Sequence, residues 1–195
     1  MSPKTITIIN GSLGGEAGNT ARVLAPLRAH LQRSARVEEL TLAAAPRRQD
    51  YEALLGASDG FVFATGTYWD SWGSPLQRFL EEATHLEGTA AWVGKPAAVV
   101  VTMHSVGGKG VLSRLQGVLS TLGCLLPPMS GLVYSLASQL ALRHAPADEP
   151  WLPELWQLDE LEVIGHNLLQ AVSGGSAWRL WQMDRDDPRR LWVEP

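Results

Sequence analysis

The sequence predicts a doubly wound α/β fold, in which helices cover both faces of a five-stranded parallel sheet with strand order 2-1-3-4-5. Three observations indicate this fold. Strand-like apolar runs alternate with segments of helical periodicity, and two of these runs are continuously apolar, as buried parallel strands are. A glycine-rich loop joins the first run to the first helical segment. Because crossovers between parallel strands are right-handed and cover the sheet, such units build layers of helix, sheet and helix.

The first half of the chain supplies two strands and two helices. Alternation of apolar and polar residues indicates the strands, and the apolar spacing of one helix face indicates the first helix, which contains Pro26. The second strand is more polar, so we expect it near an edge. The expected elements are a strand over 5–9, a helix with Ala21, Leu24, Leu27 and Leu31 on one face, a strand over 35–42 and a short helix over 50–55 capped by Asp50.

The second half supplies three strands and three longer helices. The runs 60–65 and 96–103 are continuously apolar and read as central strands. Ser74 to Gln77 matches a capping box with proline at the first helical position, so we expect Ser74 to cap the third helix. The remaining expected elements are helices over 74–83, 111–122 and 153–172 and a strand over 129–134.

Composition limits the class of protein. The chain has 195 residues, of which 45% are hydrophobic, which suits one globular domain over 1–175 followed by a tail over 176–195. A net charge of -4 argues against a nucleic-acid partner, and no apolar run is long enough for a membrane span. The single cysteine, Cys124, allows neither an internal disulfide nor a cysteine-held iron–sulfur cluster. We therefore expect a cytoplasmic protein with no membrane partner.

Tryptophan is concentrated near the carboxyl terminus. Large apolar residues gathered on a surface usually mark an interface. We therefore expect the tail to lie at a subunit interface and the protein to be a homodimer or homotetramer. The tryptophans of the last quarter are Trp151, Trp156, Trp178, Trp181 and Trp192.

The loop over 10–20 carries the main functional signal. It connects a strand to a helix, so backbone N–H groups and the helix dipole point to one place, where a phosphate is stabilised. Ser12, Asn19 and Thr20 add short polar side chains. The loop lacks the lysine of a nucleoside-triphosphate loop and the spacing of the dinucleotide fingerprint. The alternative interpretation is a flexible turn followed by an ordinary helix cap.

Three loops are expected to meet at one edge of the sheet. The loops over 10–20, 66–73 and 104–110 follow the first, third and fourth strands. In a doubly wound sheet, ligands bind at the carboxyl ends of the strands, where the strand order reverses. The sequence therefore predicts a phosphate-bearing ligand in a crevice between these three loops.

The motifs resemble the NADPH-dependent FMN reductase family of the flavodoxin-like superfamily. The resemblance rests on Asn10-Gly11-Ser12, on Gly18-Asn19-Thr20, and on Thr67-Tyr68-Trp69 followed by the helix of 74–80. It covers about two-thirds of the chain and implies a flavodoxin-like fold, FMN as cofactor and NADPH or NADH as co-substrate. Two departures are Gly66, where the family usually has proline, and the absence of a basic residue from the first loop.

The resemblance also implies a cofactor site. The first loop would hold the FMN phosphate, and the two later loops would lie along the isoalloxazine ring. His104 is placed to hydrogen-bond the flavin or to protonate an acceptor, although a purely structural histidine is the favoured interpretation. The cofactor-binding residues so expected are Ser12, Gly18, Asn19, Thr20, Thr67, Tyr68, Trp69, Asp70, Ser71, His104, Ser105, Val106, Gly107 and Gly108.

These features favour an FMN-dependent NAD(P)H oxidoreductase that reduces a quinone, a flavin or a similar small acceptor. With one doubly wound unit, nicotinamide and acceptor would use the same ring face in turn, which is a ping-pong scheme. No catalytic residue is assigned, and the scattered histidines show no metal-ligand spacing. The alternatives are a flavodoxin-like electron carrier, for which the mild net charge offers no strong docking face, and a non-enzymatic binding module of the same fold.

Overall fold

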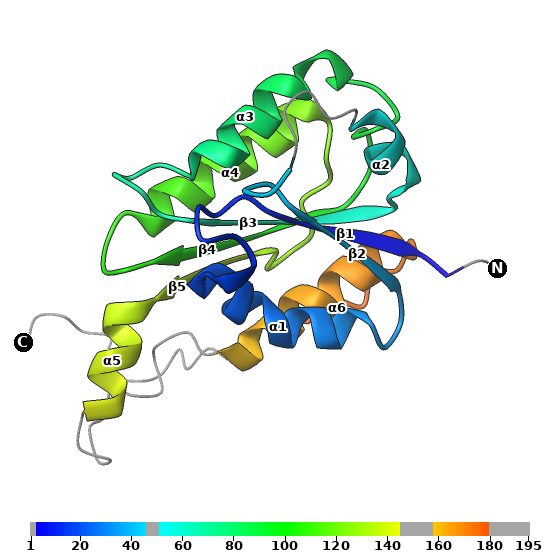
Figure 1. Cartoon of the computed structure of the whole chain (residues 1–195). Helices are drawn as coiled ribbons and strands as arrows, with labels where there is room; N and C mark the ends of the chain where they lie inside the picture. Colours follow the sequence, from blue (N-terminus) through cyan, green and yellow to red (C-terminus); the bar gives the residue numbers. More distant parts are fainter. Residues whose placement is uncertain (1–2, 46–50, 145–157, 180–195) are drawn as a thin grey trace, which may run out of the picture.

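The computed structural model describes residues 3–45, 51–144 and 158–179. Five parallel strands form one sheet in the order β2-β1-β3-β4-β5, which confirms the predicted topology. Figure 1 shows helices on both faces of this sheet. The strands are β1 (Thr5–Asn10), β2 (Arg36–Thr41), β3 (Gly60–Gly66), β4 (Ala97–Met103) and β5 (Gly131–Ser135). The helices are α1 (Asn19–Leu31), α2 (Glu52–Ala57), α3 (Ser74–Glu82), α4 (Gly108–Leu122), α5 (Leu136–His144) and α6 (Leu161–Val172), and short 3-10 turns are η1 (Gly15–Ala17), η2 (Thr84–Leu86) and η4 (Leu158–Glu160).

The central strand β3 is buried along its whole length because helices cover it on both sides. Successive side chains of a strand point to opposite faces, so Phe61 and Phe63 enter one core layer while Val62 and Ala64 enter the other. Among the described strands, β2 pairs with β1 alone and is partly exposed, as expected of an edge.

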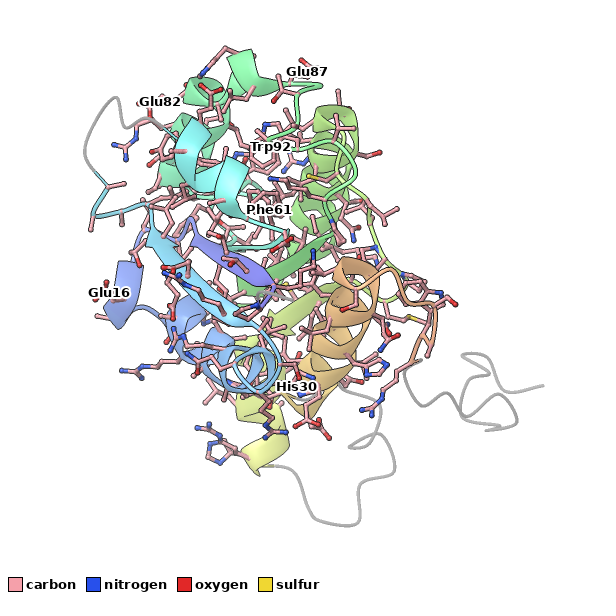
Figure 2. All side chains as sticks on the ribbon, turned by 90° about the vertical axis from the view of Figure 1, so that its right-hand side faces the viewer. Glu16, His30, Phe61, Glu82, Glu87 and Trp92 are labelled. Carbon is pink, nitrogen blue, oxygen red and sulfur yellow. The ribbon has the colours of Figure 1, made fainter. Side chains whose placement is uncertain are left out.

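The two core layers differ in composition. Between the sheet and helices α2, α3 and α4 lies an aromatic layer, in which Trp92 packs against Phe61 with ring centroids 5.3 Å apart and against Phe79 at 6.2 Å (Figures 1 and 2). The layer on the opposite face is aliphatic and joins the sheet to α1 and α6. The aliphatic layer includes Ile6, Ile8, Leu24, Leu27, Ile164 and Leu168.

The predicted cap of the third helix is wrong. Ser74 is the first residue of α3, Gly73 occupies the cap position, and no side chain caps the helix. The Gln77 side chain instead accepts a hydrogen bond from the indole N–H of Trp72 at 2.7 Å. The proline of the motif does lie in the first turn, where its missing N–H costs nothing.

Helix α5 is not predicted by the sequence patterns. It begins at Leu136, directly after the last residue of β5, so no turn residues separate the strand from the helix. Further along, α6 covers the second part of the predicted helix over 153–172, and η4 precedes it. Residues 153–157 and the expected cap Asp50 lie outside the described residues. Helix α1 continues through Pro26.

The first residues of the predicted tail pack on the same chain. The side-chain amide of Asn167, on α6, accepts the N–H of Arg179 at 2.8 Å and donates to its carbonyl at 2.9 Å. The remainder of the tail, 180–195, lies outside the described residues, so the predicted interface there stays a prediction. Among the helices that the structure describes, none has the length and apolar character needed to cross a membrane.

Candidate functional site

A cavity of about 580 Å³ lies at the carboxyl edge of the sheet. The first loop, the ends of β3, β4 and β5, and the inward face of α5 enclose it. Figure 1 shows α5 beyond the end of β5, on the same side of the sheet as α1. The lining residues are Ser12, Gly14, Gly18, Asn19, Thr20, Arg22, Val23, Gly66, Thr67, Tyr68, Thr102, Met103, His104, Tyr134, Leu136, Gln139, Arg143 and Leu158.

The first loop presents an open helix amino terminus to this cavity. Gly18 occupies the cap position of α1, and no side chain caps the helix. The N–H groups of the first turn have no intrahelical acceptor, so those of Asn19 and Thr20 are free to bind an anion. The backbones of Gly14 and Gly18 are in contact, because a Cβ on Gly14 would lie 2.8 Å from the Cα of Gly18. Glycine at both positions is what lets the loop fold this tightly.

The hydroxyl groups of the first loop hold its shape. The hydroxyl of Ser12 donates to the side-chain oxygen of Asn10 at 2.8 Å, and the backbone N–H of Ser12 donates to the same oxygen at 3.1 Å. The hydroxyl of Thr20 pairs with that of Thr102, on β4, at 2.8 Å. The loop therefore offers an anion mainly backbone donors, and these hydroxyls fix the position of those donors.

The second loop forms a tight hairpin. Tyr68 and Ser71 exchange two backbone hydrogen bonds, and the two residues between them, Trp69 and Asp70, both have positive φ, 49° and 57°. Trp69 is fully exposed and is not among the residues that line the cavity. Arg114, on α4, donates to the carbonyl of Asp70 and so ties the hairpin to the helix.

Tyr68 connects the second loop to the first. Its phenol oxygen accepts the backbone N–H of Leu13 at 3.0 Å. Beside it, the hydroxyl of Thr67 is buried and has no hydrogen-bond partner among the described residues, although Thr67 lines the cavity. A buried hydroxyl costs free energy unless it is paired, so this group is available to a ligand.

The third loop lies beside the hairpin rather than around the cavity. His104 lines the cavity, and its carbonyl accepts the N–H of Ala137, in the first turn of α5, at 2.7 Å. Gly107 has a positive φ of 86° at the cap of α4, and the Asp70 carboxylate occupies the space where a Cβ on Gly107 would project. The N–H of Gly108 points to the sulfur of Met103 at 3.3 Å.

The structure thus brings together half of the residues expected from the sequence. The expected residues that line the cavity are Ser12, Gly18, Asn19, Thr20, Thr67, Tyr68 and His104. The other expected residues belong to the hairpin and the third loop beside the cavity and do not line it. These are Trp69, Asp70, Ser71, Ser105, Val106, Gly107 and Gly108.

Sequence reasoning missed the wall that α5 contributes. Leu136, Gln139 and Arg143 recur at helical spacing and share one face, a signal that the sequence does contain. Arg22, on α1, was also missed, although it stands one turn beyond Asn19. Among the described residues no carboxylate lines the cavity, and Glu16, labelled in Figure 2, is exposed and outside it. The described part of the lining therefore carries two arginines and no acid, which suits an anionic ligand.

No metal site accompanies the cavity in the described part of the chain. Within residues 3–45, 51–144 and 158–179, no three His, Cys, Asp or Glu side chains are close enough to hold a metal ion. Cys124 is buried away from the cavity, and burial raises its pKa to about 12. Its thiol is therefore neutral near pH 7 and supplies no nucleophile.

Comparison with known proteins identifies the family of this chain and structures of the same fold. Residues 5–138 match the model of the NADPH-dependent FMN reductase family. A search of curated proteins finds no match. Among solved structures, an oxidoreductase from Corynebacterium diphtheriae has a TM-score of 0.67 and 17% identity, with 89% of this chain and 99% of that chain covered.

Two further structures show the same fold. An NADH:FMN oxidoreductase (EMOB) in its apo form has a TM-score of 0.62 and 20% identity, with 89% of this chain and 91% of that chain covered. The flavodiiron core of Flv1 from Synechocystis sp. PCC6803 has a TM-score of 0.64 and 15% identity over 88% of this chain. This chain covers only 36% of that longer protein. At these identities the likeness shows the fold alone.

Proposed function

This chain belongs to the NADPH-dependent FMN reductase family, and from that premise we propose that it binds FMN and transfers electrons from NADPH or NADH to a small acceptor, such as a quinone or a free flavin. The observation that carries the proposal is the cavity between the open terminus of α1 and the unpaired hydroxyl of Thr67. Its volume of about 580 Å³ lies within the range of roughly 300–1,000 Å³ usual for small-molecule sites.

The residues present fit a singly phosphorylated flavin. The backbone N–H groups of Asn19 and Thr20, beside Gly18, would bind the phosphate, and no acidic side chain among the described lining residues opposes it. Thr67, Tyr68 and the backbone of His104 would lie along the ring, where the Thr67 hydroxyl gains the partner it lacks. Ser12 would act indirectly, by fixing the loop through Asn10. Bound FMN supplies the hydride and electron chemistry, while the protein supplies binding and orientation.

The loop residues outside the cavity receive a different role in this proposal. Trp69 and Val106 are exposed apolar side chains beside the cavity, on the hairpin and the third loop. They would contact the flat substrates that enter, since aromatic and apolar surfaces bind flat rings. Asp70, Ser71, Ser105, Gly107 and Gly108 would hold these two loops in shape. Because this one cavity would serve both substrates, donor and acceptor would bind in turn, which is a ping-pong scheme.

An FMN titration followed by NAD(P)H oxidation tests the proposed function. Purified protein should show flavin absorbance or acquire it with FMN, and should then oxidise NADPH or NADH in the presence of a quinone. Gly18→Ala should weaken FMN binding, because its Cβ would lie 3.0 Å from the backbone of Gly14. Gly117→Ala is the matched control, since a Cβ there meets nothing within 4 Å. Protein that stays colourless with FMN, or binds it without oxidising either nucleotide, would refute the enzymatic proposal.

We further propose that the protein acts in the cytoplasm as a homodimer or homotetramer. Tryptophan is concentrated near the carboxyl terminus, where Trp178 is exposed on a single chain, and apolar residues gathered on a surface usually mark an interface. Sedimentation at micromolar concentration should give the mass of two or four chains. A monomer under these conditions would contradict the proposed assembly and leave the flavin chemistry untouched.

A further inference from the structure

The cavity lining carries two arginines to which the proposed flavin site above assigns no role. Arg22 lies on α1 and Arg143 lies near the end of α5, and both line the cavity. Within the described residues, neither guanidinium forms a hydrogen bond or an ion pair, whereas Arg28 and Arg36 pair with glutamates. These two arginines are thus available to a ligand.

The two arginines lie on helix faces that border the same cavity. On α1, Asn19 and Arg22 are three residues apart, and on α5, Gln139 and Arg143 are four apart, so each pair lies on one side of its helix. All four residues line the same cavity, which Leu158 of η4 also borders. The start of α5 is fixed to the sheet, because the N–H of Ala137 bonds to the carbonyl at the end of β4. Helix α5 therefore forms a wall of the cavity whose start is fixed relative to the sheet.

The charges of the described lining residues favour an anion. The chain as a whole has a net charge of -4, yet among the described residues no Asp or Glu lines the cavity beside its two arginines. A cleft lined by one sign of charge concentrates the field and attracts ions of the opposite sign. The planar guanidinium binds two oxygens of a phosphate or a carboxylate at once, and the two positive charges of this pair balance a phosphate dianion.

We propose that Arg22 and Arg143 bind a phosphate monoester dianion in the cavity and so determine its preference for phosphorylated ligands. The proposal rests on the proposed function, because two ligands of that function carry such a group. One source is the 5′-phosphate of FMN, which riboflavin lacks. The other is the 2′-phosphate of NADPH, which NADH lacks. Arginines on α1 and α5 would then provide the positive charge that is absent from the first loop.

Two affinity ratios test this inference. Calorimetry gives the Kd ratio of riboflavin to FMN, and steady-state kinetics gives the KM ratio of NADH to NADPH. In Arg22→Gln, in Arg143→Gln and in the double variant, one of these ratios should fall by about tenfold or more per arginine, since a hydrogen bond to a charged group contributes at least that factor. Arg33→Gln is the matched control, because Arg33 is exposed and lies outside the cavity.

The outcomes separate the two sources and the two proposals. Loss of the FMN preference alone assigns the arginines to the flavin phosphate, and loss of the NADPH preference alone assigns them to the coenzyme; either supports the inference. If the double variant keeps both ratios of the wild type, the inference is overturned even where FMN-dependent turnover persists. If the wild type binds no flavin, the proposed function fails, and calorimetry with NADPH and NADH still decides whether the arginines bind a phosphate. Unchanged unfolding curves show that the variants fold.

Discussion

At the scale of single residues, the structure explains why position 66 is a glycine. A Cβ at Gly66 would lie 2.9 Å from the phenol oxygen of Tyr68 and 3.0 Å from its ring carbon Cε2. The ring is therefore folded back over Gly66, where its oxygen reaches the N–H of Leu13. The glycine that replaces the usual proline makes room for Tyr68 and for the link between the first two loops.

Trp69 illustrates backbone strain at a candidate site. Positive φ is unfavourable for bulky residues, and a two-residue turn with positive φ at both positions favours asparagine followed by glycine. We predict that Trp69→Asn raises the free energy of unfolding by about 1 kcal/mol, because asparagine tolerates this conformation better. Urea denaturation measures the change. Val106→Asn is the control, since Val106 is also exposed but has no positive φ, and an equal gain in both variants would contradict the strain argument.

Short motifs predict site residues only where backbone geometry fixes them. Gly18, Asn19 and Thr20 could be placed at the cavity because a strand, a glycine-rich loop and a helix always direct N–H groups to one point. Trp69 is expected at the ring, and the tight hairpin leaves it fully exposed beside the cavity, a detail set by two dihedral angles that a short motif does not specify. Arg143 was missed because its place depends on α5, whose position relative to the loops is a tertiary property.

At the scale of elements, Ser135 fixes the beginning of α5. Its hydroxyl accepts the N–H of Ser138 at 3.3 Å, as a helix cap does, and lies 3.3 Å from the carbonyl of His104. We predict that Ser135→Ala destabilises α5 by about 1 kcal/mol, the usual cost of a lost cap. Hydrogen exchange of the amides in 136–144 should become faster, while exchange in α6 stays the same. Ser138→Ala keeps the cap acceptor and should leave α5 protected.

Two glycines in helices should respond oppositely to alanine. Alanine favours a helix by about 1 kcal/mol over glycine, so Gly117→Ala in α4, where the added Cβ meets nothing within 4 Å, should stabilise the protein by up to that amount. In α6, a Cβ on Gly165 would lie 2.6 Å from the His30 ring and 3.1 Å from Leu27, both on α1. Gly165→Ala should therefore be destabilising by about 1–3 kcal/mol, the usual cost of overpacking. Urea midpoints compare the two, and stabilisation by both would show that α1 and α6 can separate cheaply.

The sequence predicts elements well where one periodicity dominates. The continuous apolar runs of β3 and β4 and the apolar stripe of α4 appear in the structure within a few residues of their expected bounds. Helix α5 was not predicted because Leu136 follows β5 directly. No turn residue marks the point where the strand ends and the helix begins. The predicted cap at Ser74 does not form. The side-chain oxygen of Gln77 accepts a hydrogen bond from the indole of Trp72, five residues earlier.

At the scale of the whole molecule, the core layers on the two faces of the sheet both exclude water. Cys124 belongs to the aromatic layer and follows α4, where its N–H bonds to the carbonyl of Leu119. Burial raises the pKa of its thiol from 9.0 to about 12, although the charge of Lys95 opposes the shift. The folded state therefore favours the neutral thiol, and the unfolded chain, with the lower pKa, ionises first.

The sign of this shift gives a prediction for alkaline stability. Because the folded pKa is the higher one, the contribution of Cys124 is complete below about pH 9 and is lost as the pH rises toward 12. Cys124→Ala should lower the free energy of unfolding near pH 7 by about 1 kcal/mol, through lost packing, but should make it fall less steeply above pH 9.

Tyr51→Phe is a useful comparison, since burial also raises the pKa of Tyr51, and removal of its hydroxyl should make the free energy of unfolding depend less on pH at higher pH. Urea titrations across this range measure the slopes. Parallel curves for the wild type and Cys124→Ala would mean that the thiol is already open to water in the folded protein, and that the aromatic layer is looser than its packing indicates.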